Sequence, residues 1–465
     1  MAAKRADMWG LPLITAAAFF MQSLDMTILN TALPAIARSL HHPPLDMEFT
    51  VIGYSLTIAL LIPVSGWVAD KFGTRNTFLG AIFLFSGSSL LCAMSFSLPM
   101  LVAARVLQGV GGALMMPVAR LAVLRAYPRH ELVGVLNFVS IPGLVGPVVG
   151  PILGGWLVTF ATWHWIFLIN VPIGVAGFFY ARRVMPDFTA PCGSFDLKGF
   201  AMCGLGLVLL TCGLDAGKGL GPWFVAPAAI VTGALLFVGY VQHARRVRMP
   251  LLRLGVFRTR TFAIGIAGNV AARLGMGCIP FLMPLMLQVG LGYPAIVAGM
   301  MMSPMAVGSL TAKTFVVRLL NRFGYRRTLT GISLLIGGLT AQFALMGRHV
   351  PVWLLACPLF VLGMVMSIQF TSMNTITLGD LESGEASTGN SFLSVTQQLS
   401  INFGVAISST ILRLMGDFFP GDVLARFHYT FVIVGCITML ASLVFMLLRP
   451  DDGDNLLPHR KKRTA

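Results

Sequence analysis

The sequence predicts an all-α integral membrane protein, and three observations lead to that prediction. Of the 465 residues, 56% are hydrophobic and only 11% are charged, against roughly a quarter charged residues in soluble domains. The apolar residues form repeated runs with the length of a spanning helix, about 20 residues. The basic residues lie in short clusters between these runs. The net charge of +16 therefore indicates orientation in a membrane rather than binding to nucleic acid.

About fourteen runs are long enough to cross the hydrocarbon core of a bilayer. The first six lie at 10–33, 48–69, 77–96, 99–122, 134–158 and 164–183. The others lie at 198–215, 223–243, 262–286, 295–317, 328–346, 351–371, 391–413 and 427–448. Most basic residues fall on one side of this arrangement, for example at 71–75, 120–129, 245–260 and 318–327. Because Lys and Arg are retained on the cytoplasmic side, we expect both termini in the cytoplasm.

A short pattern occurs twice. Residues 66–75 contain an acid, a base, Phe-Gly, one further residue and an arginine, and residues 317–327 repeat this order with Asn321 in place of Asp70. If each copy joins the second and third helices of a six-helix unit, two helices remain between the units, and duplicated halves are typical of transporters. We therefore expect four parts: an N-terminal half over 1–197, an inserted helix pair and linker over 198–261, a C-terminal half over 262–449 and a basic cytoplasmic tail over 450–465.

Five segments in order resemble one family. They are 24–34, 66–75, 101–113, 143–155 and 163–174. Together they resemble the major facilitator superfamily, specifically its fourteen-helix drug:proton antiporter branch and, within that, the enterobacterial multidrug-transporter D subgroup. The resemblance runs nearly end to end. It implies the major facilitator fold, with two six-helix halves and an inserted helix pair, and proton-driven export by alternating access across a bacterial inner membrane.

Asp25 lies inside the first apolar run, Arg105 inside the fourth and Arg273 inside the ninth. A buried carboxyl can load and release a proton, so Asp25 is the candidate proton-coupling residue. Arg105 is its candidate partner, because the resemblance places the first and fourth helices side by side. Gln108 shares the Arg105 face of its helix, and Asn30 and Arg273 complete the expected substrate cavity. The structural alternatives are an interhelical hydrogen bond for Asp25 and bonds from Arg105 to helix-end carbonyls.

Charged residues and two glycines lie at the end of the second run and just after it. They are Gly66, Asp70, Lys71, Gly73 and Arg75. Charges at a helix end can pair with one another and with the helix dipole. We expect this segment to act as a latch that stabilises the outward-facing state, with simple orientation signalling as the alternative.

Small residues line one face of the fifth run. Gly146, Gly150 and Gly154 recur every four residues, accompanied by Pro147 and Gly155. Small residues let a neighbouring helix approach closely, and proline bends a helix. The pattern itself indicates tight packing and a hinge, and the resemblance associates it with antiport.

Proton-coupled secondary active export of small organic molecules, of the multidrug type, is the function we expect. Arg105 and Arg273 could make the cavity electropositive, so export of a particular organic anion, such as a carboxylate, is the alternative. No Walker-type phosphate-binding loop is present, which argues against ATP-driven transport by this chain.

Two other classes of protein fit the sequence less well than an exporter does. An enzyme is disfavoured because the acid cluster at 380–385 has no matching histidine. A membrane sensor or scaffold would leave Asp25 unexplained. The seven cysteines are scattered without a CxxC pair, so we expect no metal site and no cofactor. The expected partners are protons, a small organic solute and lipid, with no nucleic acid, and we expect a monomer.

Overall fold

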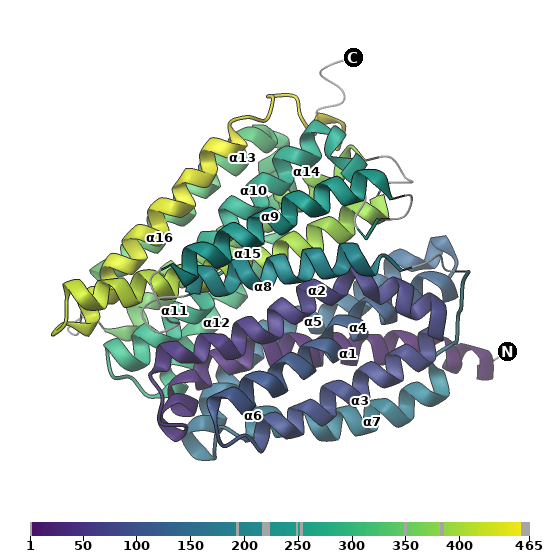
Figure 1. Ribbon diagram of the computed structural model, residues 1–465, viewed down its shortest axis with the longest axis horizontal. Coiled ribbons are helices and arrows are strands. Elements are labelled where there is room, and N and C mark those ends of the chain that lie inside the picture. Colours follow the sequence, from purple (N-terminus) through teal and green to yellow (C-terminus); the bar gives the residue numbers. More distant parts are fainter. Residues whose placement is uncertain are drawn as a thin grey trace. The chain divides into compact units, whose positions relative to one another are not determined.

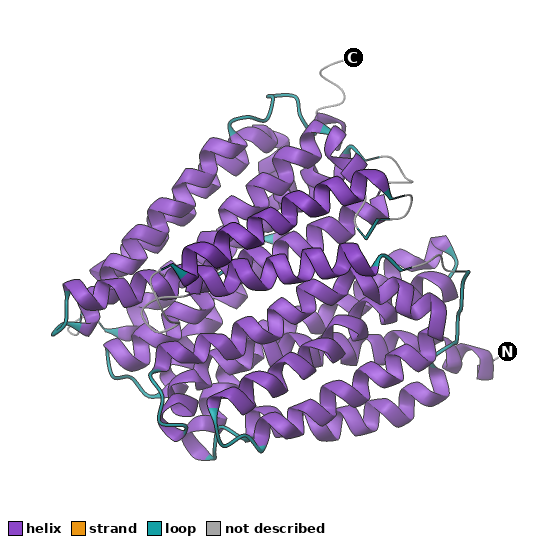
Figure 2. Ribbon diagram, viewed as in Figure 1, coloured by secondary structure: helices purple, strands orange, loops and turns teal. Residues whose placement is uncertain are grey.

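The protein is helical wherever its structure is described. The computed structural model describes residues 2–191, 195–215, 224–247, 250–251, 254–347, 351–381 and 386–456, and every regular element within these ranges is a helix (Figure 2). Each expected apolar run overlaps a helix, which confirms the all-α membrane class. Eleven described helices are long and apolar enough to span a bilayer.

The expected number of full-length spans is not confirmed. Three further apolar stretches of 10–17 residues lie at Val145–Phe160, Leu197–Thr211 and Ala295–Thr311, and the first two are parts of longer helices, Arg129–Phe160 and Leu197–Asp215. One reason lies at the second copy of the Phe-Gly pattern, where helix α13 (Lys313–Gln342) continues through a kink at Gly324 (φ 75°). The part of α13 before the kink, 313–323, follows directly on the helix at 295–311. The ends of the helices therefore do not mark the ends of the membrane crossings there.

The first compact unit comprises Met1–Leu197 with Pro294–Met300. In it, α1 packs against α4, α5 and α7, while α3 packs against α4 and α7, and α2 packs against α4 (Figure 1). The helices are α1 (Ala2–Ser39), α2 (Glu48–Phe72), α3 (Thr74–Ala93), α4 (Leu98–Ala126), α5 (Arg129–Phe160), α6 (Trp165–Leu168) and α7 (Asn170–Val184).

The second compact unit comprises Lys198–Tyr293 with Met301–Ala465. In it, α10 packs against α14, α15 and α16, while α13 packs against α14 and α16. The helices are α8 (Leu197–Asp215), α9 (Val225–Arg246), α10 (Arg260–Met276), α11 (Ile279–Leu285), α13 (Lys313–Gln342), α14 (Ala356–Gly379), α15 (Ala386–Phe418) and α16 (Val423–Phe445). Helix α12 (Ala295–Thr311) is divided between the two units after Met300.

The two units repeat one set of neighbouring helices. The pairs α1–α5, α1–α7, α3–α4 and α3–α7 of the first unit have counterparts in α10–α15, α10–α16, α13–α14 and α13–α16 of the second. Both copies of the Phe-Gly pattern turn at a glycine with positive φ, Gly73 (88°) and Gly324 (75°), a conformation that side chains with a Cβ rarely adopt. The sequence repeat therefore corresponds to a repeat of backbone structure.

The inserted helices α8 and α9 pack against each other through glycine. A Cβ on Gly233 would lie 2.8 Å from the carbonyl oxygen of Gly206, so the two backbones approach closely. Both helices cluster with the second unit. The domain boundaries expected from the sequence remain predictions, and the basic residues of the expected tail, 460–463, lie outside the described residues.

Glycine also sets the distance between α3 and α4. A Cβ on Gly111 would lie 2.7 Å from the amide nitrogen of Phe85 and 2.8 Å from the carbonyl oxygen of Ala81. Both neighbours are backbone atoms, which cannot move aside as a flexible side chain can. This contact requires a residue without a side chain.

We predict that Gly111→Val lowers the thermal unfolding temperature in detergent, because the added methyl groups force α3 and α4 apart at a cost of about 1–3 kcal/mol. The matched control is Gly87→Val in α3, since Gly87 is exposed and a Cβ there meets nothing within 4 Å. Equal unfolding temperatures for the two variants would contradict the close approach of α3 and α4.

Candidate functional site

The carboxylate of Asp25 lies inside the first unit with three side-chain donors around it. It is 1% exposed. Arg105 Nη1 donates to Asp25 Oδ2 at 2.7 Å, while Gln108 Nε2 and Asn170 Nδ2 donate to Oδ1 at 2.9 and 3.0 Å. These donors come from α4 and from the start of α7. The acid is therefore paired and hydrogen-bonded, as a buried charge must be.

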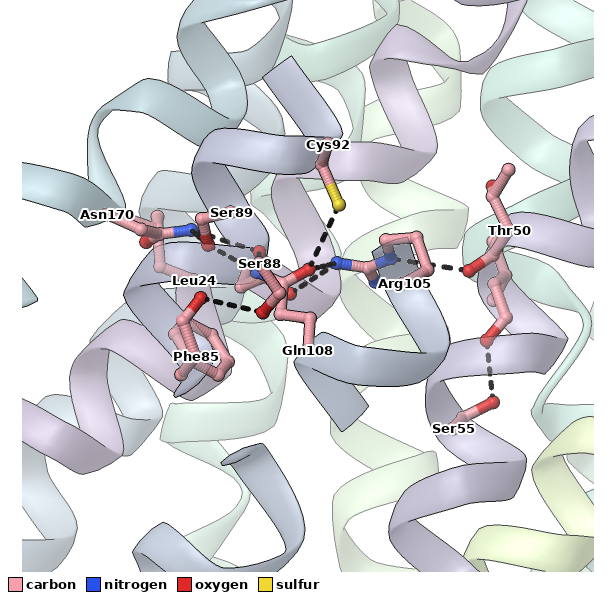
Figure 3. Close-up of polar contacts among 12 residues, drawn as sticks. Leu24, Thr50, Ser55, Phe85, Ser88, Ser89, Cys92, Arg105, Gln108 and Asn170 are labelled. Carbon is pink, nitrogen blue, oxygen red and sulfur yellow. Dashed lines mark hydrogen bonds and ion pairs between the residues drawn. The ribbon is translucent and has the colours of Figure 1, made fainter. Parts of the chain in front are cut away.

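Arg105 is held from several directions (Figure 3). Its Nη1 also donates to Gln108 Oε1 at 2.6 Å, and its Nε donates to the carbonyl oxygen of Thr50 at 3.3 Å. The guanidinium carbon lies 4.1 Å from the centre of the Tyr54 ring, within the range of a cation–π interaction. Thus α2 contributes to the site through both a backbone carbonyl and an aromatic face.

Ser89 of α3 completes the cluster. Gln108 Nε2 donates to its hydroxyl at 2.6 Å, and Asn170 Nδ2 lies 3.5 Å from the same oxygen. We call Asp25, Ser89, Arg105, Gln108 and Asn170 the Asp25 cluster. All five side chains are buried. The cluster joins α1, α3, α4 and α7, and its two opposite charges neutralise each other.

Three members of this cluster were predicted from the sequence as site residues: Asp25, Arg105 and Gln108. Ser89 and Asn170 were not predicted. The available signal was weak, because a polar residue in an apolar run is often simple helix-to-helix glue. Asn30 was expected in the cavity, but its side-chain oxygen is buried without a hydrogen-bond partner among the described atoms. Also missed was Glu48, a fully buried acid at the first residue of α2.

The glycine face of α5 packs against α1 beside Asp25. A Cβ on Gly146 would lie 2.5 Å from Ser23 Oγ, and Cβ atoms on Gly150 and Gly154 would collide with Thr27 and with the carbonyl oxygen of Ile28. Tight packing was the part of this motif predicted from the pattern alone. Gly155 does not face α1: a Cβ on Gly155 would lie 2.5 Å from the carbonyl oxygen of Ala295.

Pro147 has a specific consequence for the same contact. Proline has no N–H, so the carbonyl four residues earlier, that of Gly143, loses its helical donor. Ser23 Oγ of α1 donates to that carbonyl at 2.8 Å. Neighbouring helices satisfy freed backbone groups in this way within membranes. The proline position in α5 is thereby tied to the α1 segment that carries Asp25.

The expected latch residues are arranged differently from the prediction. Asp70 does not pair with its neighbours in the motif. Its Oδ1 accepts from Arg125 Nη2 of α4 at 2.6 Å. Successive helix residues point about 100° apart, so Asp70 faces α4 while Lys71 lies over the Trp67 ring, 4.6 Å from its centre. Gly66 is exposed, and a Cβ there would meet nothing within 4 Å.

Arg75 contacts the chain that follows α7. Its Nε donates to the carbonyl oxygen of Met185 at 2.7 Å, and its backbone N–H donates to Asp187 Oδ1 at 3.1 Å. Gly73 is the single residue between α2 and α3, with φ 88°. The motif therefore fixes a tight turn through contacts with α4 and with residues 185–187.

Arg273 belongs to the second unit and lacks a carboxylate partner within the described chain. It is 6% exposed, its Nε donates to Asn269 Oδ1 at 3.3 Å, and its guanidinium lies 4.7 Å from the centre of the Phe370 ring. Its Nη2 has no hydrogen-bond partner among the described atoms. A buried cation without a counter-charge is costly, which makes Arg273 a candidate for contact with an anion.

Known proteins closely resemble this chain. The sequence matches the family profile described as Major Facilitator Superfamily over residues 15–401 and 265–464. It is 45% identical over 460 residues, 97% of each chain, to the "Putative multidrug resistance protein MdtD" of Escherichia coli (strain 55989 / EAEC). The protein of the same name from Shigella sonnei (strain Ss046) is equally similar.

Solved structures share the fold at low sequence identity. The POT family transporter PepTSo superimposes with a TM-score of 0.71 at 14% identity, covering 94% of this chain and 97% of that one. The human organic anion transporter MFSD10 gives a TM-score of 0.58 at 14% identity, covering 94% and 99%. Together with the family profile and the relatives that match over 97% of each chain, these likenesses identify the chain as a multi-pass membrane protein that belongs to the major facilitator superfamily.

Proposed function

We propose that this protein is a proton-coupled secondary active exporter of small organic molecules, an antiporter that works by alternating access. The observation that carries the proposal is the buried Asp25–Arg105 salt bridge at 2.7 Å. The names of the relatives, which refer to multidrug resistance, support export of multidrug type. We further propose that both termini are cytoplasmic and that the monomer is functional.

The Asp25 cluster supports proton coupling for an electrostatic reason. Arg105, Gln108 and Asn170 all donate to the Asp25 oxygens, and the guanidinium of Arg105 has this carboxylate as its counter-charge. Adding a proton removes the counter-charge of Arg105, and an unpaired buried charge is strongly destabilising. Protonation would therefore be accompanied by a rearrangement of Arg105 or by access of water or solute to it.

The latch and hinge roles extend this proposal. The Asp70–Arg125 ion pair ties the end of α2 to α4, and we propose that it favours one conformation of the cycle, the outward-facing one. The glycine face of α5, with Gly146, Gly150 and Gly154, would let α1 and α5 shift against each other without side-chain collisions. Both proposed roles belong to the same transport cycle as the proposed role of the Asp25–Arg105 salt bridge.

Export of an organic anion is the second candidate, favoured by Arg273. That side chain is buried and has an unbonded Nη2, and guanidinium groups bind carboxylates with two parallel hydrogen bonds. A solute with a carboxylate would supply the missing charge. A membrane sensor or scaffold, the different-class alternative, gives no reason for a proton-sensitive buried pair.

Transport in proteoliposomes tests the proposal directly. Purified protein is reconstituted, loaded with a panel of cationic dyes and organic acids, and given a proton gradient of either sign. Movement of one chemical class that follows the gradient would support export and identify the substrate type. Folded protein that moves no compound would contradict the antiporter proposal and favour a sensor or scaffold.

We predict that Asp25→Asn abolishes coupling to the proton gradient, because an amide cannot carry the proton. The same change leaves Arg105 buried without its partner, at a cost of about 3–5 kcal/mol in stability. The double variant Asp25→Asn/Arg105→Gln removes both charges, so its unfolding temperature should return toward that of the wild type while coupling stays absent. Transport and thermal unfolding are measured on the same preparations.

Asp422→Asn is the matched control for that prediction, since it neutralises an exposed carboxylate at the start of α16. It should transport as the wild type does. Full proton-driven transport by the double variant would overturn the assignment of Asp25.

We predict that Arg273→Ala reduces transport of anionic compounds about tenfold or more while cationic compounds are unaffected, because one charge-assisted hydrogen bond contributes roughly 1.5–3 kcal/mol. The control is Lys313→Ala, which removes an exposed cation in the same unit. Uptake assays with the full panel compare the two variants. Unchanged export of every anion by Arg273→Ala would rule out the organic-anion alternative.

A further inference from the structure

The chain that follows α7 lies on the turn between α2 and α3. Thr74 N donates to the carbonyl oxygen of Phe188 at 3.1 Å, and Phe188 N donates to Thr74 Oγ1 at 2.9 Å. Thr74 Oγ1 donates in turn to the carbonyl oxygen of Pro186 at 2.8 Å. We call residues 185–190 the α7 clasp. These reciprocal bonds bind the clasp to the first residue of α3.

Asp187 supplies what the turn itself lacks. The first N–H groups of a helix need acceptors, usually from an N-cap side chain. The N-cap of α3 is Gly73, which has no side chain. Asp187 Oδ1 accepts from the backbone N–H of Arg75 at 3.1 Å, so a carboxylate from a distant part of the chain caps α3. A Cβ on Gly73 would collide with that carboxylate.

The clasp continues along the end of α2 toward the linker. Ala190 N donates to the backbone carbonyl of Asp70 at 3.2 Å. Further on, the Phe195 ring lies 5.1 Å from the Trp67 ring, centre to centre. The chain leading from α7 to the inserted helix pair therefore follows the last turns of α2. The end of α2, the start of α3 and this linker are joined at several points.

The second unit contains a counterpart built from different chemistry. After α16, Gly453 (φ 82°) lies against the ring of Tyr325, the residue that follows the repeated Phe-Gly pattern. A Cβ on Gly453 would lie 2.5 Å from Tyr325 Cδ2. Asp452 lies 3.7 Å from Arg260. In both units the segment after the last helix folds back on the repeated turn. In the first unit this segment also caps the helix that follows the turn, through the carboxylate of Asp187.

We propose that Asp187 is a positioning residue for the transport cycle: by capping α3, it makes the α2–α3 turn and the linker to α8 move as one body. This inference rests on the proposed function, because a cycle of conformations is what the clasp would serve. The turn has a single residue, Gly73, whose backbone is free to change. Without the clasp, α2 and α3 would swing independently and motion of the bundle would no longer be transmitted to the linker.

The test compares Asp187→Ala with Asp187→Asn in the full-length protein. Asparagine is as good a cap as aspartate, so only the alanine variant loses the acceptor. Hydrogen exchange read by mass spectrometry should show peptides over 72–77 and 185–190 exchanging about fivefold faster in Asp187→Ala, the factor that loss of one cap allows. Asp187→Asn should exchange as the wild type does.

Transport supplies the readout that separates positioning from simple structure. For the compound that the wild type moves, we expect Asp187→Ala to lower the rate at saturation about fivefold or more with KM unchanged, because conformational steps commonly set that rate. Asp187→Asn should restore it. The control is Asp422→Ala, which removes a cap of the same kind, Asp422 Oδ1 accepting from Leu424 N and Ala425 N at 3.0 Å each, and should leave the rate unchanged.

Each outcome decides something different. Wild-type exchange in Asp187→Ala would overturn the clasp itself. Faster exchange with an unchanged saturated rate, or an equal loss of rate in Asp422→Ala, would overturn the positioning role. A wild-type protein that transports no compound would contradict the proposed function, and the exchange experiment, which needs no substrate, would still decide whether Asp187 holds the turn.

Discussion

The interior of the first unit depends on the salt bridge between Asp25 and Arg105. Both side chains are 1% exposed, and two charges are tolerated so deep in an apolar bundle only when other groups complete their hydrogen bonds. Gln108 and Asn170 do this for the carboxylate, and the carbonyl of Thr50 does it for the guanidinium. The salt bridge and these partners together join α1, α2, α4 and α7. A shift of any one helix breaks a bond in surroundings where the loss is costly, so the pair constrains the fold as much as it marks a site.

The helix carrying Asp25 is fixed on its other side by packing rather than by charge. Glycines of α5 bring its backbone close to α1, and Ser23 donates to the Gly143 carbonyl that Pro147 leaves without a donor. Close packing and hydrogen bonding therefore act on neighbouring turns of α1. This combination explains how one helix can hold a charged residue at a defined depth.

Sequence patterns predicted the helices and the buried charges, because apolar runs and their exceptions are visible along the chain. Gln108 followed from helical spacing relative to Arg105. Ser89 and Asn170 did not, since their role depends on α3 and α7 reaching the same point in space, and polarity alone does not distinguish them from ordinary helix contacts. The partner of Asp70 was missed for a related reason. Adjacent residues of a helix point in different directions, so the nearest charges in the sequence were not the nearest charges in the structure.

The two units share a scaffold but not a chemistry. Gly109 of α4 and Gly363 of α14 each meet a backbone carbonyl of a neighbouring helix, so the close contacts recur in both. Four residues before Gly109 stands Arg105, whereas four residues before Gly363 stands the fully buried Leu359. The duplicated features are therefore those that set helix spacing, whereas within the described residues the charged cluster is found in the first unit alone. The second unit instead has Arg273, without a carboxylate partner within the described chain. A repeated scaffold allows similar motion in each half. In the antiport cycle that we propose, a proton-linked pair in each half would need two protonation events for one motion. A single charged cluster is therefore the simpler arrangement for that cycle.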